Sequence, residues 1–387
     1  MRILFLNDGI PPHLLGGSGR IVWETATGLA QKGHDVHIIT AGVAAAHTTN
    51  NGIDIHTLHE LPLRWAHYRS VFSQRRAEEV MGIIREVRPD CIHMHTVTWQ
   101  CGYRWIAKAA REGYCIIATA HDVMHIAYGR MFGTEKSLVF RDLLRTGLGW
   151  NPLRNACIKM ALRHCQHVLC VSDALRTALQ RHGIKNLITF RNGIDTDFWK
   201  PMPQGEARQS LQLPLDRPIV LLAGRVGIDK GSALVDALLP KNTLLLLAGE
   251  ACVEDFVHCS DRLQYYPKQS PEQMRLLYAA ADLALVPSIC LDCLPTICLE
   301  AGACARPVIA STYGGAKEIV TNGTTGWVLN PHDRDTFRSR MEWCSEHRME
   351  LLSFGTAARK HIEENFSLKQ YIMRLEAIYA SVARRRL

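Results

Sequence analysis

The sequence predicts an α/β protein with two doubly wound, Rossmann-like domains that face each other across a cleft. A strand, a glycine-rich loop, a helix and a second strand follow one another at the N-terminus, and a similar alternation restarts after residue 201. The length of 387 residues also suits two domains better than one core. We place an N-terminal domain at 1–200 and a second domain at 201–365. A C-terminal helix over 366–387 should pack back on the N-terminal domain.

The N-terminal domain is predicted from short apolar runs that are separated by helical spacing. Residues 2–6 (RILFL) are typical of a buried strand, and the apolar side chains after Gly19 recur with the period of a helix. Gly33 stands where a helix ends in a left-handed residue. Further strands are predicted over residues 35–40, 91–95, 115–121, 167–172 and 187–192.

The C-terminal domain follows a stretch that we interpret as a linker. Residues 201–218 contain four prolines and several polar residues. Beyond them, Ser270 and Pro271 have the pattern of a helix start. Strands are predicted over residues 219–225, 243–250, 283–288, 307–311 and 326–330, and helices over 271–281 and 295–305.

Composition narrows the class of protein. Hydrophobic residues make up 47% and charged residues 21%, as in globular proteins. No apolar run approaches the roughly 20 residues that a spanning helix needs, and the first residues lack the features of a secretory signal. We therefore expect a cytoplasmic protein, in which most of the thirteen cysteines are free thiols. Cys290 and Cys293 have C-x-x-C spacing, but no second close pair follows, so we expect no metal.

The net charge of +8 predicts an acidic partner. Basic and aromatic residues are concentrated in residues 64–76 and 130–163. Both segments are typical of solvated helix faces, and basic amphipathic segments also bind anionic membranes. Peripheral contact with the inner face of a membrane therefore stays open beside the simpler interpretation. We expect no nucleic-acid partner.

The first glycine loop, with Gly16 and Gly17, has a backbone that can approach a phosphate or an acceptor closely. A dinucleotide site is disfavoured, because the second strand ends at Thr40 without the acidic residue that would hold a ribose. The alternative is that these glycines serve only the turn.

Two cations follow the first strand of the second domain. Arg225 comes at the end of that strand, and Lys230 comes five residues later. At the edge of a cleft they would neutralise a diphosphate, the leaving group of sugar transfer. The alternative is a pair of ordinary surface cations.

The segment 287–311 is the most specific of the chain. Pro295 suits the first turn of a helix, so that the N–H groups of Thr296 and Ile297 would point towards an anion. Asp292 would lie in the loop before this helix and Glu300 inside it, where the two carboxylates can accept from sugar and ribose hydroxyls. Otherwise, they would only stabilise the helix dipole. In the first domain, His121 ends a strand, where it either contacts the transferred sugar or is purely structural.

These motifs together resemble glycosyltransferase family 4, a large retaining GT-B family. The resemblance covers nearly the whole chain in order. It rests on GGSG (16–19), AHD (120–122), VSDAL (171–175), RNGIDTDFW (191–199), GRVGIDKG (224–231), P-S…D…E (287–300), CARPVIAS (304–311), GGAKE (314–318) and NGTTGWVL (322–329).

The resemblance implies the GT-B fold, with 1–200 as the acceptor-side domain and 201–365 as the nucleotide-sugar-binding domain. It also implies a role for each candidate residue. Arg225 and Lys230 would bind the donor diphosphate, Glu300 the ribose, and Asp292 the donor sugar. Gly17 would lie near the phosphate and the acceptor, and His121 would lie near the sugar. The family is generally independent of metal, and its leaving phosphate draws the proton from the acceptor on the same face, so that the anomeric configuration is retained.

We therefore expect a retaining hexosyltransferase that uses a UDP- or GDP-sugar and a glycan or lipid-linked acceptor, with no cofactor. The family usually has Glu where this chain has Asp292, and many members have Gly where it has Pro295. The shorter carboxylate leaves two alternatives open: a catalytically silent protein that binds nucleotide sugars, and a UDP-sugar epimerase.

Overall fold

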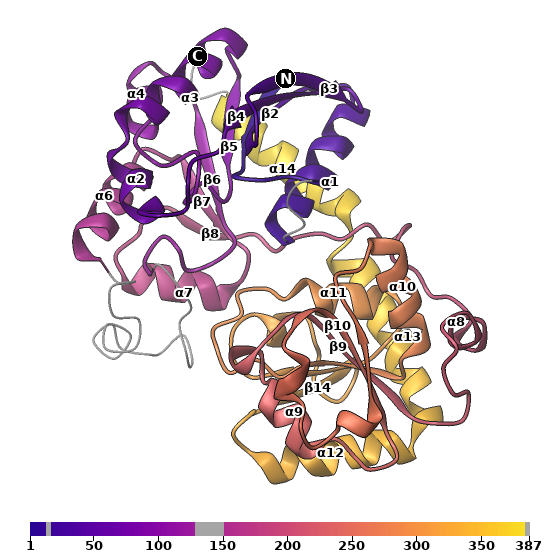
Figure 1. Cartoon of the computed structure of the whole chain (residues 1–387). Coiled ribbons are helices and arrows are strands. Elements are labelled where there is room, and N and C mark those ends of the chain that lie inside the picture. Colours follow the sequence, from indigo (N-terminus) through magenta and orange to yellow (C-terminus); the bar gives the residue numbers. More distant parts are fainter. Residues whose placement is uncertain (13–16, 128–150, 384–387) are drawn as a thin grey trace. The chain divides into compact units, whose positions relative to one another are not determined.

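The computed structural model describes residues 1–12, 17–127 and 151–383, which form two compact units (Figure 1). Unit 1 contains the described residues up to Gly193 together with the segment from Leu368 onward. The described residues of unit 2 are Ile194–Ser367. Each unit is built around its own, largely parallel sheet.

Unit 1 has an eight-stranded sheet in the order β3-β4-β2-β1-β5-β6-β7-β8. All neighbouring strands are parallel except β3, which pairs antiparallel with β4. The strands are β1 (Arg2–Leu6), β2 (Asp35–Gly42), β3 (Ala46–Asn50), β4 (Ile53–His59), β5 (Cys91–Met94), β6 (Ile116–Ala120), β7 (His167–Cys170) and β8 (Leu187–Thr189).

The centre of this sheet is apolar because helices cover both faces of a parallel sheet. Ile3, Leu4, Phe5 and Leu6 of β1 are fully buried. The described helices of unit 1 are α1 (Gly17–Gln31), α2 (Ala66–Phe72), α3 (Gln74–Val87), α4 (Ile106–Arg111), α6 (Pro152–Leu162), α7 (Asp173–Arg181) and α14 (Leu368–Ala383).

The last helix, α14, belongs to the core of unit 1 although it follows unit 2 in the chain. Tyr371, Leu375 and Tyr379 are fully buried in the same cluster as Ile3 and Phe5. The helix lies so close to α1 that a Cβ atom on Gly28 would come within 2.3 Å of Ile372 Cδ1. Figure 1 shows α14, in yellow, beside α1. Unit 1 is therefore completed by a segment distant in sequence.

Replacing Leu375 by alanine is expected to lower the free energy of unfolding by about 2–5 kcal/mol, because it removes a buried side chain and leaves a cavity. Urea denaturation would measure the change. Met373→Ala in the same helix is the matched control, since Met373 is 56% exposed. Equal midpoints for the two variants would show that α14 contributes little to the core.

Unit 2 has six parallel strands in the order β11-β10-β9-β12-β13-β14. The strands are β9 (Ile219–Val226), β10 (Leu244–Ala251), β11 (Leu263–Tyr266), β12 (Leu283–Val286), β13 (Val308–Ser311) and β14 (Gly326–Leu329). The α-helices are α8 (Gln204–Ser210), α9 (Ser232–Leu238), α10 (Pro271–Ala280), α11 (Thr296–Ala303), α12 (Arg334–Glu346) and α13 (Arg348–Asn365). The order runs outward in both directions from β9 and β12, as in a doubly wound sheet.

The structure corrects the predicted linker. Residues 204–210 form α8, whose Arg208 is 1% exposed and donates to Asp282 Oδ2 at 2.9 Å. Arg208 also donates to the carbonyl oxygens of Ala280 and Leu215. Because a buried guanidinium needs such partners, these bonds fasten the segment to unit 2. Part of the predicted linker is therefore packed structure.

Candidate functional site

The candidate site of unit 2 lies at the carboxyl ends of β9 and β12, the neighbouring strands where the strand order reverses. Loops at such a switch point form the ligand crevice of open α/β sheets. The loop after β9 contains a 3₁₀ turn, η2 (Ile228–Lys230). The loop after β12 leads into α11.

These two loops pack directly against each other. Ile289 N donates to the Asp229 carbonyl oxygen at 3.0 Å. Gly231 has φ of +81°, and a Cβ atom there would lie 2.3 Å from the Pro287 carbonyl oxygen. Only glycine fits this contact, so Gly231 sets the close approach of the loop that carries Lys230.

Lys230 and Asp292, which are 62 residues apart in the chain, form an ion pair through Nζ and Oδ2. Ser288 Oγ donates to the same carboxylate oxygen at 3.1 Å. Burial on its own would lower the pKa of Lys230, but the Asp292 carboxylate outweighs it and the net shift is upward. The structure thus holds a charged lysine beside one of the predicted acids.

Arg225 lies in β9, opposite Glu250 of β10 in the register of the sheet. Its side chain is exposed and makes no hydrogen bond or ion pair with any described residue. Among the predicted cations, Arg225 is therefore available to an anion without first losing a partner.

The N-terminus of α11 completes this edge. Pro295 is the N-cap rather than the first helical residue, which corrects the predicted helix start, and it supplies no capping side chain. The N–H groups of Thr296 and Ile297 are therefore without intrahelical acceptors. Ile297 Cδ1 lies 3.2 Å from the position of a Cβ atom on Gly224, so the helix start is packed against the end of β9. The partial positive charge of the α11 N-terminus and the cationic side chains of Arg225 and Lys230 therefore lie along the same edge of the sheet.

Glu300 occupies a different environment from Asp292. It is 6% exposed, and Tyr278 Oη donates to its Oε2 at 2.8 Å. Tyr278, in α10, is fully buried. The structure thus places Glu300 inside α11 as expected, with one carboxylate oxygen held by a tyrosine that sequence reasoning did not connect with it.

The predicted site residues of unit 1 lie at the carboxyl edge of its own sheet. His121 directly follows β6, and one of its ring nitrogens, Nε2, lies 2.8 Å from His95 Nδ1. His95 is 1% exposed, and its Nε2 has no hydrogen-bond partner among the described residues. Burial lowers the pKa of His121 to about 4, so the ring is neutral at physiological pH. Gly17 is the first residue of α1, and Gly16 lies outside the described residues.

Sequence reasoning missed His95 and the group around it. His93 Nδ1 lies 2.6 Å from Tyr379 Oη of α14, and its Nε2 lies 2.7 Å from Thr119 Oγ1. The rings of His93 and His95 are 4.2 Å apart. The alternation of His93 and His95 indicated that these two side chains lie on one face of the sheet, because residues two apart on a strand share a face. The sequence spacing did not indicate which residues of the β6 region and α14 would pair with them.

Asp8, just after β1, joins the same edge. Its carboxylate accepts hydrogen bonds from the backbone N–H groups of Trp99, Gln100 and Cys101 at 2.5 to 3.0 Å. Burial raises the pKa of Asp8 to about 6, although these three bonds favour the charged form. Asp8 thereby ties the loop after β5 to the end of β1.

Comparison with protein families decides between the classes that this geometry allows. A family model described as "Glycosyltransferase Family 4" matches residues 15–198, and one described as "Glycosyl transferases group 1" matches residues 203–361. The two matches lie side by side and together span most of both units.

The chain belongs to glycosyltransferase family 4. Two curated relatives of this glycosyltransferase are similar over much of its length. Glycogen synthase of Mycobacterium tuberculosis is 25% identical over 99% of this chain and 95% of its own. D-inositol 3-phosphate glycosyltransferase of Mycobacterium avium is 25% identical over 83% of this chain and 78% of its own.

Solved structures confirm the GT-B fold. Sucrose-phosphate synthase from Thermosynechococcus elongatus has a TM-score of 0.82 at 19% identity and covers 98% of both chains. HepE from Anabaena, solved in complex with UDP-glucose, has a TM-score of 0.73 at 17% identity and covers 98% of this chain and 100% of its own. In the described parts of this glycosyltransferase, no helix is both long and apolar enough to cross a membrane.

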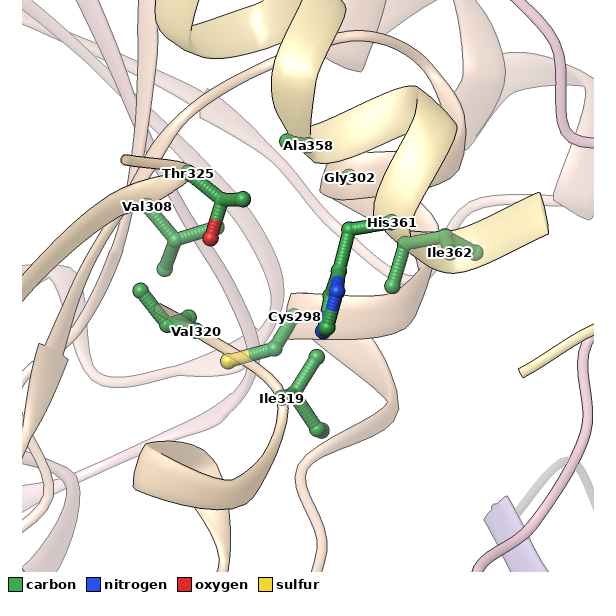
Figure 2. A pocket seen from close by; sticks show the side chains of 9 residues that line it. All are labelled: Cys298, Gly302, Val308, Ile319, Val320, Thr325, Ala358, His361 and Ile362. Atoms are coloured by element: carbon green, nitrogen blue, oxygen red, sulfur yellow. The ribbon is translucent and has the colours of Figure 1, made fainter. Parts of the chain in front are cut away.

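A small pocket in unit 2 is separate from the switch-point loops. Figure 2 shows side chains of α11, α13 and the segment after β13 around it, among them Cys298, Ile319 and His361. Its volume of about 10 Å³ is roughly the space that a single water molecule needs. The lining is mostly apolar, so the pocket suits neither a diphosphate nor a sugar.

On the ribose assignment that the resemblance implies, Glu300→Gln is expected to weaken nucleotide binding by about tenfold with the fold intact, because a charged hydrogen-bond acceptor is lost. Isothermal titration with the preferred nucleoside diphosphate measures the change. Tyr278→Phe is the companion variant, since it removes only the hydroxyl that holds Oε2. Unaltered affinity in Glu300→Gln, with unaltered thermal stability, would show that the ribose assignment is wrong.

Proposed function

We propose that the enzyme is a retaining glycosyltransferase that moves a hexosyl group from a UDP- or GDP-sugar to a glycan or lipid-linked acceptor, as in cell-envelope polysaccharide synthesis. The observation that carries the proposal is the convergence at one switch point of Lys230, Arg225 and the uncapped start of α11. Cations and oriented N–H groups are what a departing diphosphate requires.

In the proposed reaction, the donor diphosphate contacts Arg225 and draws Lys230 away from Asp292. The bond between the anomeric carbon and the diphosphate oxygen breaks, and the leaving diphosphate takes the proton of the acceptor hydroxyl on the same face. The acceptor oxygen then bonds to that face of the anomeric carbon, so the configuration is retained. The two cations can balance the developing charge without a metal ion.

The other assignments are part of the same proposal. Asp292, released from Lys230, accepts from hydroxyls of the donor sugar, and Glu300 accepts from the ribose. On unit 1, neutral His121 contacts the transferred sugar, and Gly17 at the start of α1 approaches the phosphate or the acceptor.

A thermal-shift series with UDP, GDP and ADP tests the donor half of this proposal. A ligand at about 100 times its Kd stabilises the folded protein by about 2.7 kcal/mol. We expect UDP or GDP to raise Tm, and this shift to fall in Lys230→Ala. Preference for ADP, or no shift with any of the three, would contradict the donor assignment.

The transfer itself requires a second experiment. The matching nucleotide sugar is incubated with and without a cell-derived glycan or lipid acceptor, and the anomeric configuration of the first product is read by NMR. We expect product that depends on the acceptor, with the donor's configuration. Inverted product would disprove the retaining mechanism.

The Lys230–Asp292 ion pair keeps one alternative open, because a protein that never released this lysine would bind nucleotide sugars without turnover. Such a silent protein would consume no donor under any condition. A UDP-sugar epimerase would convert the donor without an acceptor. The incubations with and without acceptor, taken together, therefore distinguish all three functions.

For the acceptor, we propose contact with an anionic membrane surface through α2 and the turn before it. Trp65 is 57% exposed, Phe72 is 44% exposed, and Arg64 lies beside them on the surface. Tyr68 Oη accepts from Asn151 Nδ2 at the start of α6, where Leu153 is also exposed. Aromatic and basic side chains together favour the membrane interface. The remainder of the second basic segment, residues 128–150, lies outside the described residues.

Vesicle sedimentation measures this contact. Arg75, exposed at the start of the adjoining α3, extends this surface. The double variant Arg64→Glu/Arg75→Glu is expected to bind phosphatidylglycerol-containing vesicles at least about tenfold more weakly, because each basic residue contributes about 1 kcal/mol near an anionic surface. Arg338→Glu/Lys360→Glu on unit 2 makes the same change in net charge and should bind like the wild type. An equal loss of vesicle affinity in both double variants would show that only the net charge of the protein matters. That result would contradict a local membrane contact through α2.

A further inference from the structure

A cluster of histidines and carboxylates lies on β2, β3 and β4, towards the start of β2 and β4. In the sheet register His37 is opposite Asp54, and His47 is opposite His56. Asp54 and His56 are two residues apart on β4, so all these side chains share one face of the sheet. Asp8, His95 and His121 lie at the other, carboxyl edge of the same sheet, so the proposed transfer reaction does not use this cluster.

The nitrogen and oxygen atoms of the cluster are spaced like the ligands of a metal ion. His37 Nδ1 lies 3.3 Å from His56 Nε2 and 4.0 Å from Asp54 Oδ2. His47 Nε2 lies 3.6 Å from Asp54 Oδ1. Bond lengths of about 2.0–2.1 Å in a tetrahedral zinc site place neighbouring ligand atoms about 3.3 Å apart. These three distances are within about 0.7 Å of that spacing. The rings of His47 and His56 are stacked with centroids 4.5 Å apart, so both rings must rotate for their nitrogens to reach the same ion as Asp54.

Outer hydrogen bonds orient two of these ligands. Asp35 Oδ1 lies 3.0 Å from His37 Nε2, and Arg2 donates to the other Asp35 oxygen at 2.6 Å. A carboxylate at Nε2 holds the ring proton there and leaves the Nδ1 lone pair directed towards Asp54 and His56. The same arrangement supports metal-bound histidines in many proteins. Thr49 Oγ1 donates to Asp54 Oδ1 at 2.7 Å, which leaves Oδ2 facing His37.

We propose that His37, His56 and Asp54 bind one divalent transition-metal ion of the zinc class, with His47 as the fourth ligand and Asp35 as the residue that positions His37. Imidazole and carboxylate ligands suit zinc, cobalt or nickel better than calcium or magnesium, which prefer oxygen alone. Asp35, His37 and Asp54 also have ligand atoms within 4.8 Å of one another.

The consequence of binding is structural. All five residues of β3 are exposed, and it is an edge strand of the sheet (Figure 1). A metal ion held by His47, His56 and His37 would connect β3, β4 and β2 through side chains in addition to backbone bonds. Metal binding by the folded state should therefore raise Tm.

The test uses the full chain after dialysis against EDTA, titrated with Co²⁺ in a visible absorption experiment and with Zn²⁺ by calorimetry. We expect one ion per chain and a Co²⁺ spectrum without a thiolate charge-transfer band. Asp54→Asn and His37→Gln should each weaken binding more than about tenfold, and Asp35→Asn by about tenfold. Zn²⁺ should raise the Tm of the wild type but not that of Asp54→Asn.

Two control variants distinguish this site from other metal-binding groups. Cys252→Ser removes an exposed thiol, and His59→Gln removes another histidine of β4. Both should bind Co²⁺ like the wild type. The proposal is overturned if Cys252→Ser abolishes binding, if Asp54→Asn and His37→Gln bind like the wild type, or if no saturable binding is measured.

Discussion

Lys230→Ala is expected to reduce kcat by about 10²–10³, the loss typical of removing one donor that stabilises transition-state charge. Negative charge grows on the leaving diphosphate as the glycosidic bond breaks, so a cation at this position acts most strongly in the transition state. The KM for the donor should rise as well, because the ground-state diphosphate is also charged. Steady-state kinetics with the donor identified by thermal shift measures both parameters.

The ion pair with Asp292 makes a second variant informative. Asp292→Asn removes the charge that Lys230 now contacts, so the affinity for the nucleoside diphosphate should be maintained or increased. On the proposed assignment of Asp292 to the donor sugar, transfer should nevertheless fall, because the accepting carboxylate is lost. If Lys230→Ala kept kcat/KM within about twofold of the wild type, a difference below about 0.5 kcal/mol, Lys230 would have no part in the reaction.

Acidification from pH 7.5 to pH 5 is expected to cost unit 1 several kcal/mol of stability. Burial lowers the pKa of His93 and His125 to about 3 and that of His121 to about 4, and it also lowers the pKa of His95 well below its usual value. In the unfolded chain each would titrate near 6.5. Below that pH the unfolded state binds more protons, so stability falls as the pH falls, by about 2 kcal/mol at pH 5 for each histidine that stays neutral.

Asp8 changes the pH dependence of stability in the opposite direction. Its pKa of about 6 in the fold exceeds the value near 3.9 in unfolded chains, so acidification to pH 5 returns about 1 kcal/mol. Urea unfolding at several pH values measures the net slope. His93→Gln should lower stability at pH 7.5 but reduce its dependence on pH. The exposed His164→Gln should leave the slope unchanged, and equal slopes in all three proteins would contradict the assignment to buried histidines.

Much of the fold could be predicted because the central strands of parallel sheets are continuous apolar runs. The runs at 2–6, 219–225 and 243–250 each became a buried strand. Strand β3 (AHTTN) escaped prediction, because an exposed edge strand has no apolar pattern and depends on its pairing with β4. The prolines of 201–218 were correctly seen as breaks, but they concealed the short α8, whose anchoring by Asp282 depends on a contact 74 residues away.

In the candidate site too, local features could be predicted from the sequence and contacts between distant residues could not. Thr296 and Ile297 were predicted to lie at the start of a helix because a local proline and the apolar residues after it mark that start, although Pro295 is the N-cap. The direct pairing of Lys230 with Asp292, the Tyr278–Glu300 bond and the His95–His121 pair join residues that are 22 to 62 positions apart. Such partners follow from how loops meet at a sheet edge, and spacing in one sequence does not reveal them.

The position of α14 in the core of unit 1 also has a consequence for biosynthesis. The residues of unit 2 from Ile194 to Ser367 are contiguous, so this unit can fold as it leaves the ribosome. Unit 1 begins first, yet the places of Tyr371, Leu375 and Tyr379 stay empty until the residues after Ser367 have been made. The half of the enzyme that is made first is therefore completed only after the other half, and until then its apolar surface needs protection from aggregation, for example by chaperones.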